Sequence, residues 1–244
     1  MTKRVNQVNQ VNAVCNERRM QELALLDENC ILVDINDKVI GSASKADCHR
    51  VDENGHVKLH RSFSVYLFNT NGDMLIQRRS KHKITYPNLF TNTCCSHPLY
   101  DIEGEREEKD VLGVRRAARR KLNQELGIPM DQIQLADLTY LMRMHYHDSG
   151  NGDWGEHEII HMLILQKDFD LNPNPSEIAE VRYIKRENFQ RDILALPVPL
   201  TPWFHLIFKN QLKFWWDNLD NLEKFKDPHT IHHLADHTKL KMKN

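Results

Sequence analysis

The stretch SFSVYLFNTNGDMLIQRR, residues 62–79, contains two apolar segments on either side of Thr70-Asn71-Gly72-Asp73. Alternation with a period of two predicts β-strands, and an Asn-Gly pair between such segments is a strong hairpin signal. The second strand ends at Arg78-Arg79, with Lys81 and Lys83 just beyond it. This basic cluster is either a solvated strand end or an anion-binding site.

Further elements extend outward from this hairpin. The periodicity predicts helices at about 16–27, 111–126, 186–194 and 203–219, and strands at 30–34, 39–43, 138–147, 155–166 and 181–184. Gly127 and Pro129 close the 111–126 helix, and residues 46–61 are expected to form a loop. Hairpins, a helix, another hairpin and closing helices indicate an α/β (α+β) fold, with a mixed β-sheet between helical layers.

The 244 residues, of which 40% are hydrophobic, can bury one full core. We expect a flexible polar tail at residues 1–15, a single domain at 16–226, and a polar tail containing His and Lys at 227–244. The tail histidines have irregular spacing and are not expected to bind metal. In the final helix, Phe204, Phe208, Trp215 and Trp216 are expected to pack in the core, whereas Trp203 at the helix start can cap a ligand pocket.

Composition also limits the class of protein. The chain has no apolar run of the roughly 20 residues that a membrane span requires, and its polar start lacks a signal-peptide core. Five cysteines without C-x-x-C spacing argue against disulfides and a zinc knuckle, so we expect reduced thiols in a cytoplasmic protein. The net charge of −1 gives no general attraction to nucleic acid or membrane.

Reactive side chains are concentrated in TNTCCSHP, residues 91–98. In an extended segment Cys95 and His97 share one face and Cys94 points to the opposite face. A buried cysteine pair that fills core volume is the alternative, since free cysteines are often buried. The His on the same face and the polar neighbours favour a reactive site.

The strand at 155–166 places Glu156, Glu158 and Ile160 on one face, and His157, Ile159 and His161 on the other. Two neighbouring carboxylates repel unless a positive charge lies between them, although both can simply be exposed. The residues His49, His60, His97, Glu156 and Glu158 have the right chemistry for one divalent metal. Their local spacing does not establish such a site.

Several motifs resemble those of the type I isopentenyl-diphosphate isomerases, which are enzymes with the Nudix fold. They are CH at 48–49, LHRSFSVYLFN at 59–69, LIQRRSKHKITYP at 75–87, TNTCCSHPL at 91–99, GVRRAARRKLNQELGIP at 113–129, WGEHEI at 154–159 and TPWF at 201–204. The resemblance runs from about residue 28 to residue 225. It implies interconversion of isopentenyl and dimethylallyl diphosphate in isoprenoid biosynthesis.

The resemblance also implies roles for individual residues. The catalytic cysteine corresponds to Cys95, the catalytic glutamate to Glu158, and the tyrosine that assists this glutamate to Tyr146. The metal site, for Mn²⁺, Zn²⁺ or Mg²⁺, corresponds to His49, His60, His97, Glu156 and Glu158, and His56 does not align with it. Glu125 would bind the Mg²⁺ that accompanies the diphosphate, and the basic residues facing the diphosphate would be Lys45, Arg79, Lys83 and Lys121. The assignment of Lys121 depends on the helix phase, because Arg120 is its neighbour.

The 113–129 helix separates this reaction from that of a Nudix hydrolase, the competing interpretation. A hydrolase needs G-x5-E-x7-R-E-U-x-E-E-x-G, but here Leu112, Lys121 and Gln124 occupy glutamate positions and only Glu125 remains. One carboxylate can hold a magnesium but cannot form a multi-metal clamp. A non-catalytic module with a structural zinc is a third interpretation, and it would not need Cys95.

Moving the double bond requires a proton delivered at C4 and another removed from C2, through a carbocation-like state. The resemblance assigns protonation to Glu158 with Tyr146 and deprotonation to Cys95, but the sequence leaves this order open. Trp203, with Tyr86 or Phe90, can provide an aromatic face over the cation. The expected partner is a small diphosphate, bound by a monomer, with a dimer left open.

Overall fold

The computed structural model describes residues 17–235 of the chain. Residues 17–27 are helical. The strands are β1 (Asn29–Val33), β2 (Val39–Ser44), β3 (His60–Phe68), β4 (Met74–Arg79), β5 (Phe90–Thr91), β6 (Cys94–Ser96), β7 (Thr139–Asp148), β8 (Glu156–Gln166), β9 (Ile178–Ile184) and β10 (Asp227–His233). The helices are α2 (Lys45–His49), α3 (Leu112–Leu126), α4 (Phe189–Leu194), α5 (Pro202–Asn210) and α6 (Leu212–Asp217).

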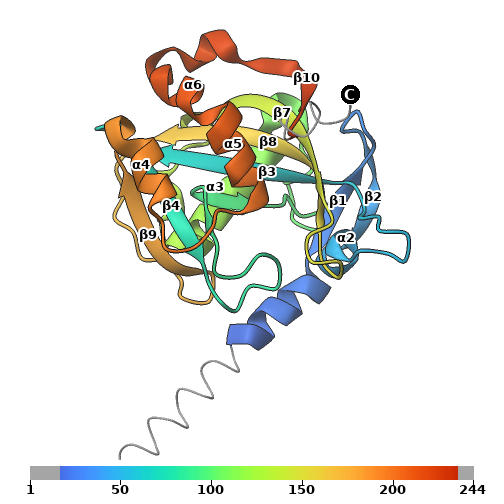
Figure 1. Cartoon of the computed structure of the whole chain (residues 1–244). Coiled ribbons are helices and arrows are strands. Elements are labelled where there is room, and N and C mark those ends of the chain that lie inside the picture. The colour runs from blue at the N-terminus through green and yellow to red at the C-terminus, as the bar shows by residue number, and fades with distance from the viewer. Residues whose placement is uncertain (1–16, 236–244) are drawn as a thin grey trace, which may run out of the picture.

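Strands β3 and β8 form the centre of a mixed sheet (Figure 1). They run parallel in register from His60 opposite Glu158 to Phe68 opposite Gln166. The main path of the sheet is β10-β7-β8-β3-β1-β2. Off this path, β4 pairs with β3, β5 and β9, and β6 pairs with β3. The hairpin predicted around Asn71-Gly72 is confirmed, because β3 and β4 pair antiparallel at their ends.

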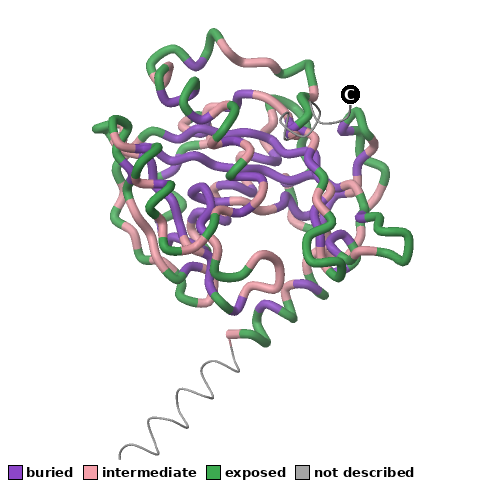
Figure 2. The backbone as a smooth tube through the Cα atoms, viewed as in Figure 1, coloured by how far each residue is buried: buried purple, intermediate pink, exposed green. Residues whose placement is uncertain are grey.

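Helices cover both faces of this sheet, as Figure 1 shows, so the predicted mixed sheet between helical layers is confirmed. Along β3, Phe63, Val65 and Leu67 pack with α3 in one core cluster. The alternate residues Tyr66 and Phe68 pack with α5 and α6 in a second cluster. Every residue of β3 is therefore buried, which is visible as the buried central strands in Figure 2.

Helix α3 ends where the sequence predicts. Gly127 adopts the left-handed conformation at φ 70°, and its N–H donates to the carbonyl of Asn123 at 2.9 Å. A Cβ at this position would lie 2.4 Å from the carbonyl oxygen of Asn172. Only glycine satisfies both the backbone angle and the space, and the cap fixes the end of the helix that carries Glu125.

Three expectations about secondary structure need correction. The expected loop at 46–61 contains α2, which Ser44 caps by accepting from the N–H of Asp47 at 3.1 Å. The expected final helix is divided into α5 and α6 at Gln211, where the backbone is not helical (φ −129°). Residues 227–233 of the expected tail form β10, which pairs with β7. The expected tail at 1–15 lies outside the described residues.

No helix within residues 17–235 is long and apolar enough to cross a membrane.

Candidate active site and metal centre

A pocket lies where β4 separates from β3. β4 pairs with β3 only at the two residues nearest the hairpin, and β6 then takes its place beside β3. The pocket reaches from this separation to α3 on one side and to Trp203 of α5 on the other. The predicted site residues that line it are Lys45, His49, Arg79, Lys83, Cys95, His97, Lys121, Glu125, Glu156, Glu158 and Trp203.

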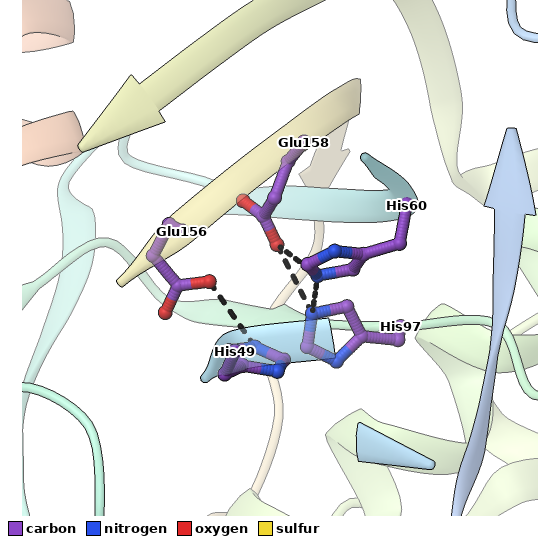
Figure 3. Close-up of side chains that lie close together, drawn as sticks. All are labelled: His49, His60, His97, Glu156 and Glu158. Atoms are coloured by element: carbon purple, nitrogen blue, oxygen red, sulfur yellow. Dashed lines mark hydrogen bonds and ion pairs between the residues drawn. The ribbon is translucent and has the colours of Figure 1, made fainter. Parts of the chain in front are cut away.

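The five expected metal ligands converge beside the pocket, and all of them except His60 line it (Figure 3). One ligand atom from each residue lies within 4.8 Å of all the others. The three imidazoles come from different places: His49 ends α2, His60 begins β3, and His97 follows β6. The two carboxylates are Glu156 and Glu158 on β8, where the parallel register sets His60 beside Glu158. Tertiary structure therefore assembles a set that local spacing could not establish.

Backbone carbonyls orient two of these imidazoles. Nδ1 of His49 lies 2.7 Å from the carbonyl oxygen of Lys45, and Nδ1 of His60 lies 2.8 Å from that of Lys58. A carbonyl only accepts, so each Nδ1 carries a proton and each Nε2 faces the centre, where it can offer its lone pair to a metal once it is unprotonated. Histidine ligands in metal sites have this arrangement.

The converging atoms need a cation between them. Nε2 of His60 lies 3.3 Å from Nε2 of His97, and Nε2 of His97 lies 3.0 Å from Oε1 of Glu158. Oε2 of Glu156 is buried 3.1 Å from Nε2 of His49 but forms no hydrogen bond among the described residues. Buried lone pairs and carboxylates repel without positive charge. The residues therefore fit a divalent ion with nitrogen and oxygen ligands.

Burial and neighbouring charges have opposing effects on the pKa values of these ligands. Burial alone would lower the pKa of His60, but its hydrogen bond to Glu158 and the charge of that residue raise it to about 9. For His97, burial and the neighbouring His49 and His60 lower the pKa well below its usual range, against the hydrogen bond to Glu158. Burial would raise the pKa of Glu158, but contacts with His60 and His97 lower it. Glu158 is therefore a carboxylate at neutral pH.

Cys95 points into the same pocket, whereas Cys94 faces the core beside α3. The alternation predicted along this strand is confirmed. Sγ of Cys95 lies 3.1 Å from the hydroxyl of Ser64 and donates to Oδ1 of Asn92 at 3.0 Å. Burial raises the pKa of Cys95 to about 12, although the Ser64 and Asn92 contacts oppose the shift. The side chain is consequently a thiol at neutral pH.

Tyr146 lies opposite Glu158 in the β7–β8 register, so the two side chains share one face of the sheet. Its hydroxyl, however, donates to Oδ2 of Asp148 at 3.1 Å, and the hydroxyl of Tyr86 donates to the same oxygen at 2.9 Å. The expected link between Tyr146 and Glu158 is not a direct hydrogen bond. Instead, Asp148 joins two tyrosines at the edge of the site.

Aromatic rings lie at the pocket that Glu158 lines. Trp203 lines the pocket and is 6% exposed. Tyr86 packs edge-on against Trp203, with ring centroids 5.1 Å apart, and the guanidinium of Arg79 lies 5.9 Å from the Trp203 ring centroid. Phe90 lies in the core and does not line the pocket.

Cationic side chains also line the pocket, namely Lys45, Arg79, Lys83 and Lys121. Glutamates hold the three lysines. Lys45 Nζ is 2.8 Å from Glu28, Lys83 Nζ is 2.6 Å from Glu177, and Lys121 Nζ is 3.4 Å from Glu125. Arg79 donates to the carbonyl oxygens of Tyr86 and Thr85.

The helix phase of α3 is now resolved. Lys121 and Glu125 face the pocket, whereas Arg120 pairs with Glu105 at 2.6 Å and donates to the carbonyl of His97 at 3.2 Å. Gln124, at a position where a hydrolase has glutamate, is exposed. Glu125 also accepts from Gln77 Nε2 at 3.1 Å. One carboxylate from this helix is therefore available beside the cationic cluster.

Sequence reasoning missed several contributors. Gln21 and Leu25 of the first helix line the pocket. Burial would raise the pKa of Glu28, but Lys45 and Lys121 lower it to about 2, so it is a fixed counter-charge. Glu177 follows a loop that has no local signal for a site. The contact of Ser64 with Cys95 follows from the strand register, which the sequence does not specify.

Comparisons with known proteins agree with this geometry. The model of the NUDIX domain matches residues 58–204. Isopentenyl-diphosphate Delta-isomerase 1 of Mesocricetus auratus is 46% identical over 88% of this chain and 95% of its own length. The Dictyostelium discoideum isopentenyl-diphosphate Delta-isomerase is 44% identical, over 86% and 91% of the two chains. The crystal structure of DR0079 from Deinococcus radiodurans shares the fold, with a TM-score of 0.50, 20% identity, and coverage of 75% of this chain and 99% of that chain.

Proposed function

Because this chain belongs to the isopentenyl-diphosphate delta-isomerase family within the Nudix domain class, we propose that it interconverts isopentenyl diphosphate and dimethylallyl diphosphate in isoprenoid biosynthesis. One observation carries the proposal. Cys95 and Glu158 line a single pocket that is also lined by Trp203 and by four cationic side chains. The pocket thus provides two proton-transfer groups for a short hydrocarbon chain and basic side chains for its diphosphate.

The reaction requires two proton transfers to carbon. A proton is added at C4, which places a positive charge at the tertiary C3, and a proton is then removed from C2. Cys95 comes from β6 and Glu158 from β8, so they approach the pocket from different strands. We assign one transfer to each side chain. At neutral pH the thiol holds a proton and the carboxylate does not, so the pair can donate and accept without prior exchange with solvent.

The surrounding side chains support these two groups. Ser64 and Asn92 hold the sulfur of Cys95. Tyr146 and Asp148 lie beside Glu158 in the hairpin, and the hydroxyl of Tyr146 donates to Asp148. The Trp203 ring offers electron density to a cation and, being almost fully buried, helps to exclude water from it.

Two divalent ions complete the proposal. An ion held by His49, His60, His97, Glu156 and Glu158, whether Mn²⁺, Zn²⁺ or Mg²⁺, would fix the orientation of Glu158. Mg²⁺ bound by Glu125 together with the diphosphate would neutralise part of the phosphate charge. Lys45, Arg79, Lys83 and Lys121 provide the remaining positive charge from the protein itself.

The residues of α3 argue against the competing hydrolase function. Of the glutamate positions of the hydrolase motif, Lys121 occupies one and forms an ion pair with the remaining Glu125. A lysine at this distance competes with a metal for the carboxylate, and a multi-metal clamp on a pyrophosphate bond lacks its ligands. We further propose that the enzyme acts as a cytoplasmic monomer, independent of nucleic acid and membrane.

Incubation with isopentenyl diphosphate and Mg²⁺ in D₂O tests the proposal. An isomerase incorporates deuterium at the exchangeable carbons and forms dimethylallyl diphosphate without releasing phosphate, which NMR detects directly. Release of phosphate without deuterium incorporation would instead identify a hydrolase. Binding without either change would identify a non-catalytic module.

A further inference from the structure

A second group of histidines lies on the face of the sheet opposite the pocket. His145 and His147 occupy alternate positions of β7 and therefore share a face. His147 is directly opposite His157 of β8, and His145 is directly opposite His233 of β10. None of these four residues belongs to the active site. His145 and His157 are half-buried, and His147 and His233 are exposed.

Two nitrogens in this group already have nearly the separation that a metal requires. Nε2 of His145 lies 2.9 Å from Nε2 of His157. Two imidazole nitrogens on one tetrahedral zinc ion, with bonds of about 2.0–2.1 Å, are roughly 3.3 Å apart. The ring of His147 packs edge-on against His157, with centroids 4.9 Å apart. Because His147 is exposed, its ring can rotate to bring in a third nitrogen.

The partners of these rings fix which nitrogen is free to bind. Nδ1 of His157 donates to the carbonyl of Val57 at 2.8 Å, so its Nε2 carries the lone pair. Nδ1 of His145 lies 3.2 Å from Nδ1 of His233. When Nε2 of His145 binds a metal, its proton resides on Nδ1 and His233 accepts it. Both rings thus have the outer hydrogen bond that orients histidine ligands in metal sites.

We propose that His145, His147 and His157 form a second, surface site for a borderline transition-metal ion such as Zn²⁺, with His233 as a positioning residue. Imidazole nitrogens without carboxylate oxygens favour Zn²⁺, Ni²⁺ or Cu²⁺ and exclude Mg²⁺. The site joins β7 to β8 behind Tyr146 and Glu158. It is distinct from the buried centre, to which it contributes no ligand.

Zinc binding by the full chain tests this site. Elemental analysis after equilibrium dialysis against Zn²⁺ should show about one ion fewer per chain in His147→Gln and in His145→Gln than in the wild type. His56→Gln, which changes a histidine whose side chain is 77% exposed, is the matched control and should retain the wild-type content. Circular dichroism reports whether each variant is folded, and His147 is exposed enough for its variant to remain so.

Two further measurements complete the test. His233→Gln should weaken the extra Zn²⁺ by about 10–100-fold without abolishing it, as expected for an outer partner of a ligand. Excess Mg²⁺ should not displace the extra ion. Equal zinc content and affinity in the wild type and His147→Gln would overturn the proposal, and so would displacement of the extra ion by Mg²⁺. Neither result depends on the isomerase activity.

Discussion

The two faces of β8 carry ionisable residues in different arrangements. On the pocket face, Glu156 and Glu158 converge with three imidazoles on a common point. On the opposite face, His161 Nε2 contacts Asp37 Oδ2 at 2.9 Å. Asp37 also accepts from Arg61 Nε at 2.7 Å, so its charge has direct partners. One strand therefore contributes Glu156 and Glu158 to a binding site and His161 to a closed structural network.

This difference has a thermodynamic consequence. A buried carboxylate whose partners surround it stabilises the fold, and removing it leaves its partners uncompensated. Carboxylates that converge with lone pairs are organised to bind a ligand. Without the ligand their repulsion lowers stability locally, and the stability of the rest of the fold compensates for it. Substitutions on the pocket face should therefore change function more than stability, and substitutions in the Asp37 network should do the reverse.

Glu158→Gln should have the largest effect on the pocket face. The substitution removes a proton-transfer group while nearly keeping the shape of the side chain, so turnover should fall by about 10²–10⁴-fold. Binding of a non-reactive diphosphate analogue should persist, because the substitution leaves the charges of Lys45, Arg79, Lys83 and Lys121 in place. Steady-state kinetics and calorimetric titration of the analogue measure the two effects. Near-normal turnover would remove Glu158 from the proton-transfer role.

Strand β6 provides a second comparison between faces. Cys95→Ala should reduce turnover by about 10²–10⁴-fold, because the thiol faces the pocket, and should leave the thermal midpoint nearly unchanged. Cys94→Ala is the matched control on the opposite face. It removes a fully buried thiol from the core beside α3, so it should lower stability by about 1 kcal/mol while turnover remains. Equal losses of turnover in both variants would contradict the assignment of faces.

Asp37→Asn should have the largest effect on stability. It breaks a buried ionic network, so the free energy of unfolding should fall by about 3 kcal/mol. Turnover of the folded enzyme should change little, because Asp37 faces away from the pocket. Urea denaturation and a turnover assay at low temperature separate the two quantities. A large loss of turnover with unchanged stability would show that the opposite face takes part in the reaction.

The same variant makes a pH prediction. Burial would raise the pKa of Asp37, but the contacts with His161 and Arg61 lower it to about 2 from the usual 3.8. A lowered pKa in the folded state adds stability that is present above about pH 4 and is lost as the pH falls toward 2. The shift corresponds to about 2 kcal/mol. The stability difference between wild type and Asp37→Asn should accordingly narrow between pH 5 and pH 2, and a constant difference would contradict the assignment.

Local signals in the sequence predicted much of the fold. The Asn71-Gly72 hairpin, the end of α3 at Gly127 and the alternation at Cys94 and Cys95 all depend on neighbouring residues, and the structure contains each of them. Short or interrupted elements were missed. Helix α2 has only five residues, too few for a periodic pattern, and the division between α5 and α6 has neither proline nor glycine to mark it.

The motifs predicted which residues belong to the site, but not the strand register, ion pairs and hydrogen bonds that join them. The family motifs placed the five ligands together, although nothing in their spacing sets His60 beside Glu158; the parallel register does. The counter-charge Glu177 and the hydrogen bond from Tyr146 to Asp148 depend on side-chain positions that only the folded chain defines. The surface histidines were missed for the same reason, since they meet across β7, β8 and β10.

Glu125→Gln tests the expectation that the pocket holds two different ions, one at the five converging ligands and a Mg²⁺ at Glu125. Glu125 lies beside Lys121 and Gln77 and is not among the five converging ligands. The amide keeps the hydrogen-bonding shape but loses the charge that Mg²⁺ prefers. Affinity for a diphosphate analogue at saturating Mg²⁺ should fall by about tenfold, or about 1.4 kcal/mol, and KM should rise more than kcat falls.

The metal content of the converging centre is the internal control for this variant. It should remain at the wild-type value by elemental analysis, because Glu125 is not among its ligands. Gln124→Ala, at an exposed position of the same helix, should affect neither quantity. If Glu125→Gln binds the analogue as tightly as the wild type at every Mg²⁺ concentration, α3 contributes no ligand to a substrate magnesium. The diphosphate would then be held by the lysines and Arg79 alone. In that case the pocket would use a metal at the five converging ligands and only side-chain cations for the diphosphate.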